Sequence, residues 1–465
     1  MKLAELLSGL PPEPDEAALF PGLQDAVRRG PRPLVAIDDD PTGVQTVHDT
    51  AVLLTWGDEE LRAQLQDSRP VFFVLTNSRS VPEPRAAEIN TAIGQRLQGS
   101  GCVVASRSDS TLRGHYPAEV LALQDGLRQQ FDGHLIVPAF FEGGRYTIND
   151  THWVASSDEA VPASETSFAR DAVFGYSTAH LPSWVEEKSH GRWTADQVLS
   201  VPLQAIRDGA ACERLMQAQG GQPVVVNAAG YGDLTAFVLG LLEAEAHGKR
   251  FLYRTAASFV RVRAGMPARA PLTAQEVYAA CGEQAAETPG LVVVGSYQPS
   301  TTQQVELLLA ESRLKPHPLE VDVPAVLAKG WSAEAFGASM DAALSAGKLP
   351  VLYTSRELVT SARQEENLDI GRAVTEALLD ALHRLQVRPR FVIAKGGITS
   401  HEVAQRGLGA LRAEVLGQLL PGVPVWRLES GPGLRFPGMP YVVFPGNVGG
   451  PTSLLEATRT LSRSE

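Results

Sequence analysis

Short apolar runs recur along the chain and alternate with segments whose apolar residues return at helical spacing. The runs are rich in Val, Ile and Phe, a composition typical of strands that are buried on both faces. They occupy residues 33–37, 50–56, 70–76, 101–106, 133–140, 223–228, 290–296, 349–355, 390–396 and 441–447. Helical spacing is clearest in residues 84–98, 302–314 and 371–386.

This alternation predicts an α/β fold with mostly parallel sheets flanked by helices. At 465 residues the chain is too long for one ordinary domain. A short, basic, proline-bearing stretch, 262–272, precedes a helix-like segment and a second group of strands, so it marks a boundary. We therefore expect an N-terminal extension, a substrate-binding domain, a linker with a helix, and a second domain, at 1–30, 31–265, 266–285 and 286–465.

Polar residues follow five of the predicted strands, at the points where the strands end. The sequences are DDDPTG, NSRS, RSDSTLRG, KGGITS and PGNVGG, at 38–43, 77–80, 107–114, 395–400 and 445–450. Ligands of open α/β sheets bind just past the carboxyl ends of the strands. The pattern predicts one ligand site in each domain.

The polar residues of the first domain suit a small acid. Three consecutive carboxylates, Asp38 to Asp40, repel one another and need a cation or hydrogen-bond donors nearby. Carboxylates so placed serve in phosphoryl transfer and proton abstraction. Arg107 and Arg113 can each grip a carboxylate bidentately. The set fits a hydroxyl-bearing acid such as a sugar acid, and the alternatives are an Asp-rich turn and a surface cluster of ion pairs.

Glycine turns dominate the candidate chemistry of the second domain. Segments 295–304, 395–404 and 445–457 each join a strand to a helix. Glycine lets the backbone approach phosphate oxygens, and the N-terminus of a helix favours anions. Thr399 is expected to cap its helix in a capping box with Glu402. These turns predict a nucleotide site, with plain strand–helix connections as the alternative.

Several known signatures do not occur in the sequence. It contains neither a P-loop GxxxxGK[ST], nor a GxGxxG after a strand, nor HExxH, nor GxSxG. The three cysteines are far apart and the ten histidines show no ligand spacing, so no residues are predicted as metal ligands.

Charge and composition narrow the class of partner. The net charge of −12 argues against nucleic acid and anionic membranes as partners. No apolar run approaches the roughly 20 residues that span a bilayer, and the acidic, proline-broken N-terminus is unlike a signal peptide. With 44% hydrophobic residues, the sequence predicts a soluble, cytoplasmic protein.

Taken together, the motifs resemble those of the four-carbon acid sugar kinases. AIDDDPTGVQ is similar to the family's ADDLTGA, SRSDSTLRG to KKxDSTLRG, TNSRS to TxSR, and PAFFEGGRYTIND to PAxxxxGR. VVVGSYQPSTTQQ resembles SGSxSxxTxxQ, KGGITSHEVA resembles GGxTA, and PGNVGG resembles KxGxFG. The likeness runs in order from about residue 33 to 456. Two of the positions at which the sequence departs from the family motifs lie in the predicted acid site: Asp38 replaces the family's Ala, and Arg107 stands near its lysines.

The resemblance implies an acid-sugar-binding domain followed by an ATP-binding domain, with the active site in the cleft between them. It implies transfer of the γ-phosphoryl group of ATP, with Mg²⁺, to a hydroxyl of a tetronate-like acid. Asp39 or Asp40 would be the catalytic carboxylate. The acid would be bound by Asn77, Ser78, Arg79, Arg107, Asp109 and Arg113. ATP would be held by Ser296, Gln298, Lys395, Gly396, Gly397, Thr399, Gly446 and Gly449.

Two other functions stay open at this point. One is an ATP-dependent enzyme that acts on a different small carboxylate. The other is a catalytically inactive member of the fold that only binds its ligands. In each case the expected partners are small molecules, neither nucleic acid nor membrane, and assembly into a homo-oligomer is compatible with the sequence.

Overall fold

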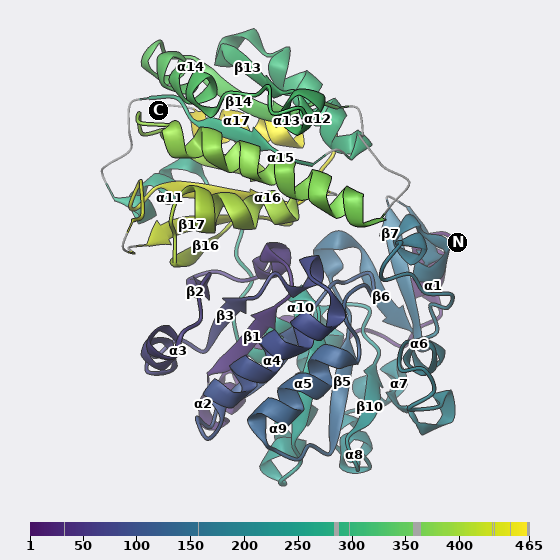
Figure 1. Ribbon diagram of the computed structural model, residues 1–465. Coiled ribbons are helices and arrows are strands. Elements are labelled where there is room, and N and C mark those ends of the chain that lie inside the picture. The colour runs from purple at the N-terminus through teal and green to yellow at the C-terminus, as the bar shows by residue number, and fades with distance from the viewer. Residues whose placement is uncertain are drawn as a thin grey trace. The chain divides into compact units, whose positions relative to one another are not determined.

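The structure of the protein is a computed structural model, shown in Figure 1. It describes residues 1–31, 33–156, 158–282, 288–296, 298–356, 364–429, 431, 433–446 and 448–462. The chain forms two compact units. The first comprises Met1–Val47 and Thr55–Ala268, and the second comprises His48–Leu54 and Arg269–Glu465.

The first unit is built on a parallel sheet with the strand order β3-β1-β4-β11-β5-β10-β9. Its strands are β1 (Leu34–Asp38), β3 (Val71–Leu75), β4 (Val103–Arg107), β5 (Gly133–Val137), β9 (Leu199–Val201), β10 (Gln222–Val226) and β11 (Phe251–Thr255). Every residue of β1, β3, β5 and β11 is buried, as expected for a sheet covered on both faces. Asp38, at the end of β1, is in register with both Leu75 and Arg107. The polar segments that follow these three strands therefore begin side by side.

Helices surround this sheet. They are α1 (Leu3–Ser8), α2 (Glu16–Arg29), α3 (Asp58–Leu65), α4 (Glu83–Leu97), α5 (Ala118–Leu127), α6 (Leu181–Lys188), α7 (Leu203–Arg207), α8 (Ala211–Met216), α9 (Tyr231–Ala246) and α10 (Ala257–Arg263). Helices α4 and α5 pack closely because Gly94 faces Gly126: a Cβ on Gly94 would lie 2.9 Å from the Leu123 carbonyl oxygen. A small antiparallel sheet of β6 (Arg145–Ile148), β7 (Thr151–Ser156) and β8 (Glu159–Pro162) completes the unit.

The second unit has a mixed sheet with the order β13-β14-β12-β15-β18-β17-β16-β2. The parallel part contains β12 (Leu291–Val294), β13 (Pro316–Val321), β14 (Leu349–Thr354), β15 (Val392–Lys395) and β18 (Pro440–Phe444). The antiparallel part contains β2 (Thr50–Leu53), β16 (Arg412–Leu420) and β17 (Val423–Glu429). Its helices are α11 (Ala274–Cys281), α12 (Pro299–Leu309), α13 (Val323–Leu327), α14 (Ala333–Ser345), α15 (Gln364–Arg384), α16 (Gly397–Glu402) and α17 (Ser453–Ser462).

The predicted α/β class and the mostly parallel sheets are confirmed, and each of the ten apolar runs overlaps a strand. The compact units differ from the expected domains: the first unit includes the stretch 1–30, expected as an extension, and runs on to Ala268, while His48–Leu54 belongs to the second unit. Strand β2 lies in the second unit, where it pairs with β16 in antiparallel register. This pairing joins residues that are more than 350 positions apart in the sequence, so no local sequence pattern predicts it.

Within the described residues, no helix combines the length and the apolar character that crossing a membrane requires.

Candidate functional site

An arginine–aspartate pair forms the centre of the polar cluster in the first unit. Arg79 holds Asp39 with two donors: Nη2 to Oδ1 at 2.5 Å and Nε to Oδ2 at 3.2 Å. Ser108 Oγ donates to the same carboxylate at 2.7 Å. Asp39 is 3% exposed, and its charge is stabilised by this bidentate partner. Asp39 is therefore locked in place by the segments that follow β3 and β4.

The other two consecutive aspartates lie in different surroundings. Asp40 retains 18% side-chain exposure, lies 3.5 Å from Arg79 and accepts from the backbone N–H of Thr42 at 2.8 Å. Burial alone would raise the pKa of Asp40, but Arg79 and Thr42 outweigh it and the pKa is lowered. Asp40 is thus an ionised carboxylate that solvent, and hence a substrate, can reach.

Asp38 is paired with the other residue that departs from the family motifs. Arg107 Nη1 lies 3.0 Å from Asp38 Oδ1, and both side chains are almost fully buried. Burial raises the pKa of Asp38 to about 7, and the attraction of Arg107 opposes that rise. Gly43 makes room for this carboxylate, since a Cβ there would lie 1.8 Å from Asp38 Oδ2. The two departures from the family pattern therefore form one ion pair.

The segment after β4 supplies a second arginine–aspartate pair. Arg113 Nε donates to Asp109 Oδ2 at 2.8 Å, and the Thr111 hydroxyl donates to the same oxygen. Asp109 also lies 3.8 Å from Arg79 Nη1, which links the two pairs. Burial would raise the pKa of Asp109, but the neighbouring arginines hold it well below its usual range.

Asn77 and Ser78 support the cluster through the backbone turn before Arg79 and a hydrogen bond to Glu119. Asn77 adopts a left-handed backbone (φ 51°) directly before the short helical turn Ser78–Ser80, and this turn presents Arg79. Ser78 Oγ donates to Glu119 Oε1 at 2.5 Å. Burial raises the pKa of Glu119 to about 7. The structure thus gathers all eight residues predicted for the acid site into one region of the first unit.

Two further arginines belong to this region and were not predicted. Arg145 begins β6, and Arg254 lies in β11. Within the described part of the chain, neither has a carboxylate within ion-pair distance. Arg145 stacks on Phe168, while Arg254 lies over the rings of Tyr116 and Trp184. Burial lowers the pKa of both guanidinium groups.

These arginines give the region two positive charges that no carboxylate of the described residues pairs with. Arg254 lines a small cavity together with Asp109, Trp184 and Thr255. The sequence did contain a signal for Arg145, because it is the arginine of the segment that resembles PAxxxxGR. Arg254 sits inside an apolar strand, "FLYRT", where nothing in the local pattern marks it.

In the second unit, three turns meet at the carboxyl ends of β12, β15 and β18, which are neighbours in the sheet. A Cβ on Gly295 would lie 2.2 Å from Thr399 Oγ1, and one on Gly446 would lie 3.0 Å from Ser296 Oγ. Ser296 Oγ bonds Thr301 Oγ1 at 3.1 Å, and Thr301 in turn donates to the Gly446 carbonyl at 3.1 Å. The glycines therefore let three backbone turns approach one another closely.

Most of the predicted ATP-site residues line these turns. Gly396 has φ +117°, a conformation that other residues rarely adopt, and Gly397 begins α16. Gln298 precedes α12 and is exposed, while Gly449 packs against Ser453. Tyr297 and Asn447 of the corresponding motifs lie outside the described residues.

The capping box expected at Thr399 is wrong. Helix α16 begins at Gly397 with Gly396 as its N-cap, and that end has no side-chain cap. Thr399 instead stands in the first turn of the helix and faces Gly295 and Gly396. The glycine at positive φ starts the helix three residues earlier than the capping pattern suggests.

Lys395 is buried and faces carbonyl groups. Its Nζ donates to Pro445 O at 2.8 Å and Val448 O at 3.3 Å, and lies 4.0 Å from the centre of the Phe444 ring. Burial lowers the pKa of Lys395 to about 7. The ammonium group thus fastens the turn after β18, and its contacts are all internal to the unit.

Two family models match the chain. A sugar-binding N-terminal domain matches residues 34–263, and a nucleotide-binding C-terminal domain matches residues 291–454. The chain belongs to the four-carbon acid sugar kinase family. The arginine–aspartate cluster thus lies in the sugar-binding domain of this family, and the glycine turns lie in its nucleotide-binding domain.

Solved structures share the fold. The crystal structure of Haemophilus influenzae protein HI1011, a DUF1537 protein, matches with a TM-score of 0.60 and 21% identity, covering 92% of this chain and 100% of that chain. A Salmonella typhimurium LT2 protein, described as a candidate tRNA synthase, matches with a TM-score of 0.66 and 20% identity, covering 92% and 98%. At these identities the likeness shows the fold alone. Among curated proteins, none matches this chain in sequence.

Proposed function

We propose that the protein is an ATP-dependent kinase that phosphorylates a hydroxyl group of a small sugar acid. The observation that carries the proposal is the cluster around Arg79 in the sugar-binding domain. There, a partly exposed, ionised aspartate, Asp40, lies beside a group of arginines, two of which have no carboxylate partner within the described residues. Such a site suits a ligand that carries both a negative charge and hydroxyl groups.

The carboxylate of the acid is bound by arginine. Arg145 is the best placed, because its side chain is half-buried, its Nε has no described hydrogen-bond partner, and no described carboxylate forms an ion pair with it. A ligand carboxylate would form charge-assisted hydrogen bonds with this guanidinium. These bonds would offset the unfavourable free energy of leaving the cation desolvated and unpaired. Arg113 stacks on the same Phe168 ring and lies on the same side of the cluster.

The hydroxyl that accepts the phosphoryl group is oriented by Asp40. Of the three consecutive aspartates it is the most exposed, and it is ionised. Phosphoryl transfer needs positioning and charge neutralisation more than a strong base, so a carboxylate of lowered pKa can serve by holding the hydroxyl hydrogen. Asp39, held by Arg79 and Ser108, positions this loop.

The residues of the second unit fit a bound nucleotide. Gly295, Gly396 and Gly446 stand where any Cβ would meet Thr399 or Ser296, so the three turns can come this close only with glycine at these positions. The first-turn N–H groups of α12 have no partner within the helix and can donate to phosphate oxygens. ATP supplies the γ-phosphoryl group, and the Mg²⁺ that accompanies it neutralises phosphate charge. Lys395 acts indirectly, by fixing the turn that contains Gly446.

ADP release measured with Mg-ATP and a panel of acids tests the proposal. The panel contains D- and L-threonate, D-erythronate, the 3-oxo-tetronates, and five- and six-carbon sugar acids. We expect one acid to raise ADP release well above the rate with ATP alone. Asp40→Asn should lower that turnover by about 100-fold or more while ATP binding, followed by calorimetry, is unchanged.

Asp58→Asn is the matched control, because Asp58 is an exposed aspartate at the start of α3 that pairs with Arg96. This variant should keep wild-type turnover. If ATP binds but no acid is turned over, the inactive binding member is favoured. If a carboxylate other than a sugar acid is consumed with ATP, the protein is instead an ATP-dependent enzyme that acts on a different small carboxylate.

A further inference from the structure

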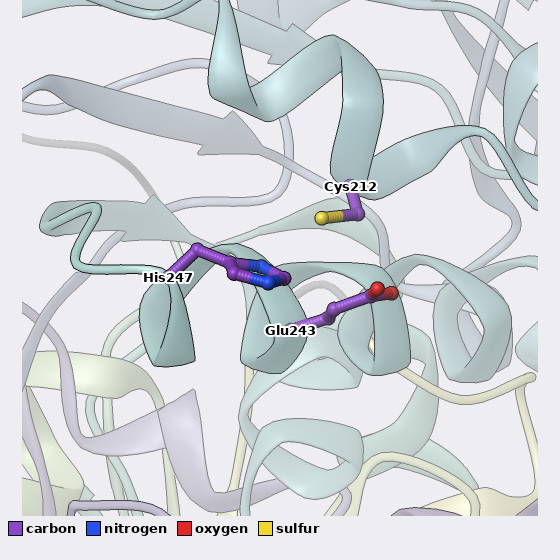
Figure 2. A group of neighbouring side chains, drawn as sticks. All are labelled: Cys212, Glu243 and His247. Atoms are coloured by element: carbon purple, nitrogen blue, oxygen red, sulfur yellow. The ribbon is translucent and has the colours of Figure 1, made fainter.

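Three side chains with metal-binding atoms meet between α8 and α9 in the first unit. Cys212 is the second residue of α8, Glu243 lies in the last turn of α9, and His247 follows that helix directly. Figure 2 shows the thiol of Cys212 facing the side chains of the other two from across the gap between the helices. The cysteine sulfur, one carboxylate oxygen and one imidazole nitrogen all lie within 4.8 Å of one another.

The packing of the two helices places the thiol. Gly240 of α9 contacts the start of α8 so closely that a Cβ there would lie 2.8 Å from Ala211 Cβ and 2.9 Å from the Cys212 backbone nitrogen. Glu243 and His247 lie three and seven residues after Gly240, so they share its face of the helix. Cys212 is thus held over the same face of α9 that carries the carboxylate and the imidazole.

No described neighbour competes for these three groups. Within the part of the chain that the structure describes, none of the three side chains forms a hydrogen bond or an ion pair. The situation differs elsewhere: the Cys102 sulfur accepts from Ser100 Oγ at 3.0 Å. Burial raises the pKa of the Cys212 thiol, and the negative charge of Glu243 raises it further. A cation between them would reverse both effects.

We propose that Cys212, Glu243 and His247 form a binding site for a divalent cation of the zinc class. The cysteine binds as thiolate after releasing its proton to solvent, the glutamate binds through one oxygen, the histidine binds through one ring nitrogen, and water fills the fourth position. A thiolate with an imidazole selects zinc-like ions, whereas Mg²⁺ and Ca²⁺ prefer sets of oxygen ligands.

The distances suit such an ion after a small adjustment. Tetrahedral ligands at about 2.0–2.3 Å from a zinc ion lie about 3.3–3.8 Å from one another. The three ligand atoms, which lie up to 4.8 Å apart, would therefore have to move about 1 Å closer together. Glu243 and His247 are both exposed, so rotation of their side chains can supply this movement without disturbing the core.

The position of the site indicates a structural role. Helix α9 runs from the carboxyl end of β10 back to the start of β11, so its last turn lies at the amino-terminal edge of the sheet. The sixteen residues of α9 span about 24 Å. The ion would fasten α8 to α9 at the edge opposite the strand ends that carry the acid site, and it would take no part in phosphoryl transfer.

Titration of the full-length, metal-free protein with CoCl₂ tests the proposal, in the presence of a non-thiol reductant and excess Mg²⁺. We expect one equivalent of Co²⁺ to bind, with a thiolate-to-cobalt charge-transfer band, and ZnCl₂ to displace it. Cys212→Ser should abolish the band. His247→Ala should weaken binding at least tenfold. Cys102→Ser, which removes a comparable half-buried thiol, should leave the titration unchanged.

Thermal unfolding adds an independent readout, since an ion that binds the folded state raises Tm. Zinc should raise the Tm of the wild type and of Cys102→Ser, but not of Cys212→Ser. The proposal is overturned if stoichiometric Co²⁺ fails to bind, or if binding survives unchanged in both Cys212→Ser and His247→Ala. Loss of turnover by the Cys212→Ser protein would contradict the purely structural role.

Discussion

Replacing Gly295 by alanine tests whether the turns after β12 and β15 must approach closely to bind ATP. The new Cβ would lie 2.2 Å from Thr399 Oγ1 and 3.3 Å from Thr399 Cβ, whereas ordinary contact begins at 3.4 Å. The turn and the first turn of α16 must therefore separate by about 1 Å. A misplacement of this size costs on the order of 100-fold in the efficiency of a positioned reaction.

We expect Gly295→Ala to lower kcat/KM for ATP by about 100-fold while the acid still binds with wild-type affinity. The assay is coupled ADP release with ATP varied, supported by calorimetric titration of each ligand. Gly450→Ala is the control, because Gly450 belongs to a neighbouring glycine turn and a Cβ there has nothing within 4 Å. Adding Thr399→Ala to Gly295→Ala removes Thr399 Oγ1, the atom that the new Cβ would clash with. The double variant should therefore have the activity of Thr399→Ala alone. Wild-type ATP kinetics in Gly295→Ala would refute the reasoning.

Four further variants probe the sugar-binding domain. Arg145→Ala removes the proposed anchor of the acid carboxylate, so the KM for the acid should rise tenfold to a hundredfold, roughly the loss of one charged hydrogen bond, with the KM for ATP unchanged in the same assay. Arg79→Met leaves the buried Asp39 without its bidentate partner and should lower the free energy of unfolding by about 3–5 kcal/mol in urea titrations; a loss below 1 kcal/mol would show that the pair is not needed for stability. The folded-state pKa of Asp38, about 7, lies above its ordinary 3.8, so the folded state binds this proton more tightly and stability from Asp38 is lost as pH rises from about 4 to about 7. The free energy of unfolding of Asp38→Asn should therefore rise relative to that of the wild type as the pH rises through that range. Asp109→Asn removes a carboxyl of lowered pKa, so its free energy of unfolding should instead fall relative to that of the wild type as the pH rises from acid values.

Much of the fold could be predicted because parallel strands are buried on both faces. The runs "PLVAI", "PVFFVLT" and "GLVVVGS" overlap β1, β3 and β12, and each has a continuous apolar stretch. Strands β16 and β17 lack that signal. In β16, buried residues are interspersed with half-exposed ones, as expected at the antiparallel side of a mixed sheet. A continuous run of apolar residues is therefore the wrong signature for this part of the fold.

The candidate site was predictable as far as residues follow strand ends. Asp39, Arg79 and Asp109 meet because β1, β3 and β4 are parallel neighbours, a consequence of the α/β topology itself. Arg254 could not be found in this way, since it reaches the cluster from within a buried strand. Nor could Cys212 be grouped with His247 from sequence, because the packing of α8 on α9, and not residue spacing, brings them together.

The side chain of Lys395 shows a further limit. A lysine before two glycines at a strand end resembles a phosphate ligand in sequence. In the structure its ammonium group donates to the carbonyls of Pro445 and Val448. Sequence spacing gives the position of such a residue, but only packing decides whether its charged group faces a ligand or the protein.

The most direct test of the central claim is to identify the products of the reaction itself. The protein would be incubated with Mg-ATP and the acid that most stimulates ADP release, and the acid would be analysed by mass spectrometry and ³¹P NMR. We expect an acid heavier by one phosphoryl group, with a phosphate-ester resonance, formed in equal amount to ADP and absent with Asp40→Asn. ADP accompanied by inorganic phosphate and unmodified acid would contradict it.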